Sequence, residues 1–112
     1  MSILDRVVKH FDSKATVRIE VPEWADEKGN PTVLFSEPFT LAERQKLSKM
    51  AHEDDLEFIV RLIIMKCKKE NGDQAFDLSD KPTLMHKADP EVVSRISSQI
   101  VSTKSVEDMT GN

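Results

Sequence analysis

Between positions 3 and 11 the apolar residues follow a spacing of three to four, which is typical of one face of an α-helix. They are Ile3, Leu4, Val7, Val8 and Phe11. Ser2, with Asp5 three positions later, resembles the capping arrangement that begins such a helix. We therefore expect a short amphipathic helix here, which lies either on the domain or on a neighbouring molecule.

The next stretch alternates between apolar and polar residues instead. Residues 17–21 have the period of two that is typical of a half-buried strand, and Pro22 ends it. Positions 25–31 form a polar cluster with glycine and proline, which favours a turn. Residues 32–35 again have the composition of a strand. The two segments therefore predict a small antiparallel hairpin.

The central part of the chain carries two helix signals in succession. Thr40 followed by Glu43 is a capping box that begins the first of these helices. The acidic pair at 54–55 then caps a longer helix, which we expect to run to about Glu70. Asn71-Gly72 has the composition of a helix end at that point.

The C-terminal part begins with a loop at 73–79, which we expect Phe76 and Leu78 to anchor. Pro82 favours the first turn of a short helix that reaches Lys87.

A last helix begins with Asp89, Pro90 and Glu91, which serve as cap, first helical residue and acidic first turn. Its apolar face consists of Val92, Val93, Ile96 and Ile100. The sequence from Ser102 onward is polar and carries no cap, so we expect a frayed end there.

Together these elements predict an α+β fold that is mainly helical, with one small antiparallel β-hairpin and four to five helices. We expect a single domain over residues 1–104 and a flexible C-terminal tail over residues 105–112. A chain of 112 residues supports one hydrophobic core. Its 38% hydrophobic and 32% charged residues are typical of a globular protein.

The helix predicted from residue 54 has apolar residues on two sides. One stripe contains Leu56, Ile59, Val60, Ile63, Ile64 and Cys67, and the other contains Phe58, Leu62 and Met65. A helix that is apolar on two sides must be covered on both. Either another element of the domain, such as the last helix, covers the second stripe, or a separate protein chain does. Trp24 has the same two interpretations, a lid on the core or a contact with a partner.

Charge and hydropathy narrow the class of function. The formal charge is −4, and the one short basic cluster, Lys66, Lys68 and Lys69, falls where a helix dipole favours cations. We therefore do not expect general nucleic-acid binding, which depends on Lys and Arg. The longest mainly apolar stretch, 56–67, is too short and too charged to span a membrane, and the N-terminus lacks a signal-peptide pattern. We expect a cytoplasmic protein.

No group of residues has the spacing of a catalytic or metal site. His52 lies beside acidic residues, but adjacent positions do not face one another on a helix, so a metal site is not expected. Cys67 and His86 are a conceivable nucleophile and base, but Cys67 falls on an apolar helix side, where a thiol packs as a small hydrophobe. The three glycines are too far apart for a phosphate loop. We predict no enzymatic activity, no cofactor and no metal.

The order of these motifs resembles a known family. The strand at 17–21 that ends in Pro22-Glu23-Trp24, the strand at 32–35 and the capped helix from Thr40 are followed by a hydrophobic helix and Asn71-Gly72-Asp73. A segment at 84–87 and Pro90 leading to Arg95-Ile96 complete the series. Over residues 15–104 the chain is similar to the tail assembly chaperones of long-tailed, non-contractile bacteriophages.

This resemblance implies a non-enzymatic assembly factor in the host cytoplasm that is absent from the mature virion. Such proteins bind the long helical tape measure protein, keep it in solution and help the tail tube to assemble around it. A longer product, made by a ribosomal frameshift, recruits the tail tube protein, and the present chain would be the short product. The resemblance also implies self-association, as a ring or spiral.

As a hypothesis, the contacts with the tape measure protein or with further copies involve Val7, Val8, Phe11, Trp24, Phe58, Leu62 and Met65. The alternative is a small regulatory module that binds nucleic acid through Lys66, Lys68 and Lys69. A hydrolase is a third hypothesis, which no pair of carboxylates supports by its spacing.

Overall fold

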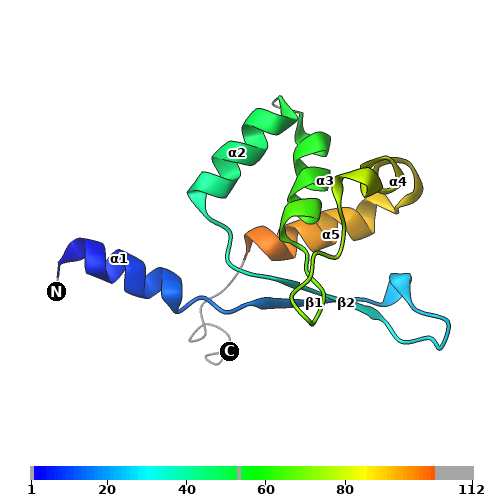
Figure 1. Ribbon diagram of the computed structural model, residues 1–112, viewed down its shortest axis with the longest axis horizontal. Helices are drawn as coiled ribbons and strands as arrows, with labels where there is room; N and C mark the ends of the chain where they lie inside the picture. The colour runs from blue at the N-terminus through cyan, green and yellow to red at the C-terminus, as the bar shows by residue number, and fades with distance from the viewer. Residues whose placement is uncertain (1, 53, 103–112) are drawn as a thin grey trace.

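The computed structural model describes residues 2–52 and 54–102 (Figure 1). Over these residues it contains five α-helices, two strands and two 3-10 turns. Their order is α1 (Ile3–Asp12), β1 (Val17–Val21), η1 (Pro22–Trp24), β2 (Thr32–Ser36), α2 (Leu41–Ala51), α3 (Asp55–Lys66), η2 (Leu78–Asp80), α4 (Lys81–Lys87) and α5 (Pro90–Val101). The predicted fold class, α+β and mainly helical with one antiparallel hairpin, is confirmed.

The hairpin shows why its strands alternate. β1 and β2 pair antiparallel, with Ile19 opposite Leu34 and Val21 opposite Thr32. Ile19 and Leu34 are buried beneath the helices, whereas Glu20 is exposed on the other face. The period of two therefore separates a core face from a solvent face, as predicted.

The helix predicted to reach Glu70 ends four residues earlier, at Lys66. Cys67 is extended and Lys68 pairs with Phe35 of β2, through hydrogen bonds of 2.8 and 2.9 Å between their backbone groups. The open edge of β2 thus satisfies backbone groups that a further helical turn would otherwise satisfy.

Residues 69–75 then fold back on this extended segment, and Lys68 also bridges to Gln74. Gly72 lies in the turn with φ of +92°, a left-handed value that favours glycine. The prediction that Asn71-Gly72 ends the helix was therefore wrong, because these residues form the turn of a loop instead.

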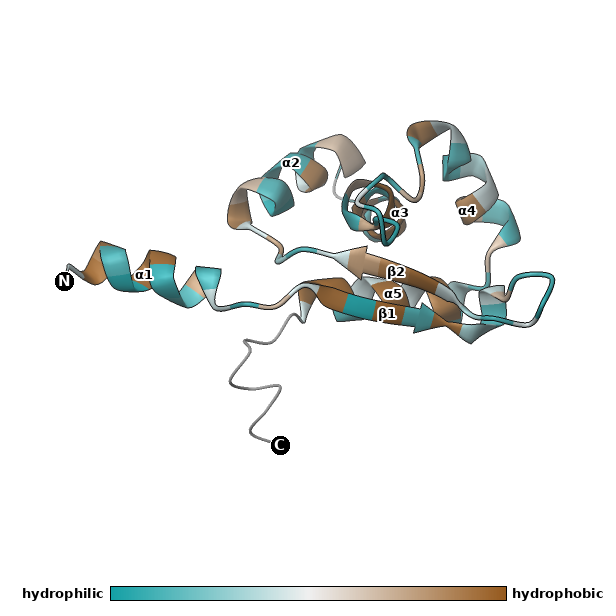
Figure 2. Ribbon diagram, turned by 60° about the horizontal axis from the view of Figure 1, so that its bottom comes forward, coloured by the Kyte–Doolittle hydropathy of each residue, from teal (hydrophilic) through white to brown (hydrophobic). Residues whose placement is uncertain are grey.

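The core lies around α3, which contacts α2, α4 and α5 (Figure 2). Viewed along its axis in Figure 2, α3 lies between α2 and α4, with the hairpin beneath it. Leu62, Ile63, Ile96 and Ile100 have no exposed surface. The second stripe of α3 is consequently packed against other elements of this chain, which is its internal interpretation, whereas Leu56 at the start of the first stripe is 66% exposed.

The C-terminal elements follow the predicted signals closely. Pro82 lies in the first turn of α4, and the Asp89 side chain accepts a hydrogen bond of 2.9 Å from the Glu91 backbone N–H at the start of α5. Phe76 packs on the core, but Leu78 is 60% exposed, so the prediction that Leu78 anchors the loop was wrong. The predicted tail, 105–112, lies outside the described residues.

Within the part of the chain that the structure describes, no helix combines the length and apolar character needed to cross a bilayer.

Candidate protein-binding surface

Helix α1 has an apolar face that no other part of the described residues, 2–52 and 54–102, covers. Ser2 and Asp5 form the predicted capping box, with hydrogen bonds of 3.1 and 3.2 Å between each side chain and the other residue's backbone N–H. The helix projects from one end of the molecule, and none of its residues is buried (Figures 1 and 2). We call its five apolar residues the α1 face: Ile3, Leu4, Val7, Val8 and Phe11, which are 39% to 76% exposed.

The lower part of the α1 face continues onto the body of the protein. Val7, Val8 and Phe11 line an apolar hollow of about 430 Å³ together with Leu41, the first residue of α2, and with Phe39 and Thr40, which precede it. We call this the α1 hollow. Leu41 is 85% exposed, although it is a large aliphatic residue. Apolar surfaces that run together across two elements are typical of protein-binding sites.

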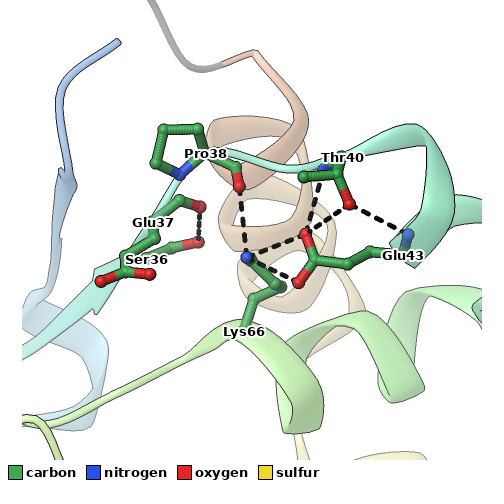
Figure 3. A network of polar contacts seen from close by, with 6 residues as sticks. All are labelled: Ser36, Glu37, Pro38, Thr40, Glu43 and Lys66. Carbon is green, nitrogen blue, oxygen red and sulfur yellow. Dashed lines mark hydrogen bonds and ion pairs between the residues drawn. The ribbon is translucent and has the colours of Figure 1, made fainter. Parts of the chain in front are cut away.

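The body side of the α1 hollow is held in place by a polar network (Figure 3). Thr40 and Glu43 make the predicted capping box, with a Glu43 N–H to Thr40 Oγ1 bond of 3.0 Å and a Thr40 N–H to Glu43 Oε1 bond of 3.0 Å. Lys66, at the end of α3, donates to both Glu43 oxygens at 3.0 and 3.1 Å and to the Pro38 carbonyl at 3.3 Å. The segment that carries Phe39 and Leu41 is therefore tied to the central helix at both ends.

Glu43 is ionised in this network. Burial alone would raise the pKa of its carboxyl group, but the Thr40 backbone N–H and the Lys66 ammonium outweigh that effect and lower the pKa. Lys66 is only 7% exposed, so its charge depends on Glu43 for compensation.

Trp24 lies half-buried against the core, with its ring edge-to-face with Phe76 at 6.3 Å between centroids. Its backbone carbonyl accepts a hydrogen bond from the Thr32 hydroxyl. Next to it, Glu23 forms a two-pronged ion pair with Arg95 of α5, at 2.7 and 2.8 Å. Trp24 thus contacts the core in the manner of a lid.

The three residues proposed on the second stripe of α3 are not on one accessible surface. Leu62 has no exposed surface, and Phe58 and Met65 are half-buried against the core. The intact fold therefore does not offer Leu62 to a partner.

The lysines of the nucleic-acid alternative do not form a basic patch. Lys66 is buried and paired with Glu43, and Lys68 is half-buried in the pairing with β2. Lys69 is the member of the three that is exposed. The three lysines are separated because α3 ends at Lys66, so that Lys66 belongs to the helix whereas Lys68 and Lys69 belong to the segment after it.

Cys67 packs in the core with no exposed surface, as its place on an apolar helix side suggested. This burial raises the pKa of the thiol to about 12, so it is protonated at neutral pH. Among residues 2–52 and 54–102, no three His, Cys, Asp or Glu side chains converge on a point where an ion would sit.

Sequence reasoning found α1 but missed the other exposed apolar residues. Together with Leu47 and Met50, Leu41 belongs by its spacing to the apolar side of α2, and Leu56 belongs to the first apolar stripe of α3, yet they are 85% and 66% exposed. Both lie in the first turn or two of their helices, where the helix projects past its covering neighbours.

Comparison of the chain with protein-family models, with curated proteins and with solved structures gives no match.

Proposed function

We propose that this protein is a phage tail assembly chaperone that binds the tape measure protein, keeps it in solution and promotes assembly of the tail tube. The observation that carries the proposal is the α1 face, an amphipathic helix whose apolar residues nothing in the described chain covers. The class of partner comes from the order of motifs along the sequence, which resembles that of phage tail assembly chaperones. In this proposal the protein acts in the host cytoplasm and is absent from the mature virion.

The α1 hollow is the proposed docking site for the tape measure protein. An apolar hollow beside an apolar helix suits a partner that is itself an amphipathic helix, because helices bind in grooves through side chains at intervals of three and four residues. Val7, Val8 and Phe11 form one wall, and Phe39 and Leu41 form the other. The partner would bury the apolar side that makes it insoluble alone.

The size of this surface indicates weak binding by each copy. Burying the five apolar side chains of the α1 hollow, Val7, Val8, Phe11, Phe39 and Leu41, is worth about 5–10 kcal/mol before costs, whereas association itself costs about 4–15 kcal/mol. Tight binding then requires many copies that act together on one long partner, through avidity. The net charge of −4 also favours solubility of a chain that carries exposed apolar surface.

The proposal extends to two further partners. Copies of the chain associate with one another as a ring or spiral on the tape measure protein. A longer frameshifted form would bring the tail tube protein to this assembly.

Co-expression with the tape measure protein tests the proposed function. We expect the wild-type chain to keep the tape measure protein in the soluble fraction and to co-purify with it. The double variant Val8→Asp, Phe11→Asp should reduce the co-purified amount at least about tenfold, because it places charges in a contact that must be dry. Ser48→Asp, which adds a charge to the exposed side of α2, is the matched control and should behave as wild type.

Two results would contradict the proposal. A wild-type chain that leaves the tape measure protein insoluble would refute the function. A double variant that retains full binding would refute the role of the α1 hollow. The nucleic-acid alternative predicts instead a steeply salt-dependent binding of DNA or RNA, which the burial of Lys66 does not favour.

A further inference from the structure

A second apolar surface lies on the far side of the molecule from α1. It is a cleft of about 200 Å³ between α3, α4 and α5, which we call the helix groove. Leu56 of α3 and Met85 of α4 stand at its rim and are 66% and 39% exposed. The other lining residues are Ile59, Val60, Leu84, Ala88, Pro90, Val93 and Ser94.

The first turn of α1 is a second feature that the proposed function leaves unused. Ile3 and Leu4 lie beyond the α1 hollow, and they are 76% and 71% exposed, the highest values among the apolar residues of this helix. We call these two residues the α1 tip. Asp5 and Arg6 flank them with opposite charges.

We propose that the α1 tip of one copy inserts into the helix groove of a second copy. This inference rests on the self-association included in the proposed function and names the two surfaces that make the contact. It leaves the α1 hollow open for the tape measure protein, because the tip and the hollow use different residues of α1.

The size of the helix groove favours a few side chains over a small molecule. Pockets for small ligands usually enclose about 300–1,000 Å³, which exceeds the volume of this cleft. A branched pair such as Ile3 and Leu4 needs less room, and the lining of the cleft is almost entirely apolar.

Charge beside the groove complements one flank of the α1 tip. Asp54 and Asp55 at the start of α3 are exposed and adjoin the lining residue Leu56. Asp89 and Glu91 are exposed on either side of the lining residue Pro90, next to the exposed Lys87. An insertion that sets Arg6 beside the start of α3 therefore pairs opposite charges.

The same charges disfavour pairing of α1 with another α1 in antiparallel orientation. In such a pair each flank meets the same flank of the partner helix. Arg6 would then lie near His10 of the second copy, and Asp5 near Asp12. The second juxtaposition brings two carboxylates together, which opposes the contact at neutral pH.

The connection to β1 opposes insertion into the groove of the same chain. Residues 13–16 join α1 to β1, and a connector of this length spans at most roughly 15–18 Å. Figure 1 shows α1 extending from one end of the molecule and α4 at the other. A second copy is not held by this connector.

A contact between two different surfaces repeats from copy to copy. It closes into a ring if the rotation between neighbours permits, and otherwise continues as a spiral. Each copy then uses its tip once and its groove once.

Disulfide trapping of the purified chain, without any tape measure protein, tests the inference. We would mix the single variants Leu4→Cys and Met85→Cys and oxidise them mildly. We expect a mixed disulfide dimer at a yield at least about tenfold above that of either variant alone, and a ladder of larger species from the double variant. The native Cys67 is buried and does not compete.

Leu41→Cys mixed with Met85→Cys is the matched control, because Leu41 is highly exposed but lies in the α1 hollow. This pair should give only background cross-linking. Dimers of Leu4→Cys alone at the same yield would show pairing between α1 helices, and an internal disulfide in the double variant would show insertion within one chain. Either result, or no disulfide at all, would overturn the inference.

Charge reversal gives a second readout. Arg6→Glu should weaken self-association roughly threefold to tenfold in sedimentation experiments, and adding Asp55→Arg should restore it. Loss without rescue would place Arg6 against some other group and overturn the proposed orientation. Because these measurements omit the tape measure protein, a negative result here leaves the co-expression result of the proposed function unaffected.

Discussion

Helices α1 and α3 carry comparable apolar signals but have opposite environments. α3 is covered by α2 on one side and by α4 and α5 on the other, and Leu62 and Ile63 have no exposed surface. α1 has an apolar face that is just as regular, yet none of its residues is buried. Amphipathic spacing therefore identifies the side of a helix that needs a partner, and the tertiary structure decides whether that partner is in the same chain.

The largest expected difference between the two helices is in stability. Leu62→Ala should lower the free energy of unfolding by about 2–5 kcal/mol, because it leaves a cavity in the core. Leu4→Ala on α1 should change it by less than about 0.5 kcal/mol. Urea denaturation of both variants measures this, and equal losses would mean that α1 packs on the body in solution.

Removal of the ion pair between Lys66 and Glu43, which links α3 to the α1 hollow, should have an intermediate effect on stability. Lys66→Met keeps most of the apolar stem but leaves Glu43 without its buried cation. We expect a loss of about 1–3 kcal/mol, measured by thermal or urea unfolding. Glu43→Gln alone should also destabilise the fold. The double variant should lose less free energy of unfolding than the two single variants lose in sum. Simple additivity would show that the pair does not interact.

A smaller effect should appear in the way the stability of the fold depends on pH. The paired Arg95 guanidinium, through its hydrogen bonds, lowers the pKa of Glu23 from its ordinary 4.5 to about 2. The pair therefore stabilises the fold fully above pH 4.5 and progressively less as the pH falls toward 2. The urea midpoint of wild type minus that of Glu23→Gln should be positive at neutral pH and approach zero near pH 2. A difference that does not change with pH would contradict this.

The smallest effect on stability is expected from substitutions in the α1 hollow. Val8→Asp with Phe11→Asp should leave the melting temperature nearly unchanged, because neither side chain is buried. Its consequence should appear only in binding, as measured by co-purification. If this variant unfolds the body, then α1 contributes to the core and the contrast with α3 is wrong.

Local signals in the sequence predicted most of the fold. The caps of α1, α2 and α5 each lie within three residues of the helix that they begin, so their meaning did not depend on the rest of the chain. The hairpin likewise followed from alternation and from the turn at 25–31. These elements were correct because short-range hydrogen bonds and side-chain periodicity determine them.

Features that depend on distant residues could not be predicted in the same way. The end of α3 is set by pairing between Lys68 and Phe35, which are far apart in sequence. The helix groove needs side chains from three helices, and no single segment shows its pattern. The Lys66 to Glu43 ion pair also joins two elements, and before the fold was known Lys66 looked like part of an exposed basic cluster.

The isolation of α1 makes it a reporter as well as a binding element. Helices of about ten residues are marginal in water without tertiary contacts, so amide hydrogens of α1 should exchange quickly in a lone copy despite its well-formed cap. Any molecule that settles on its apolar side would slow that exchange. Mass spectrometry of this one segment would then read out, at each stage of an assembly reaction, the fraction of copies that have found a neighbour.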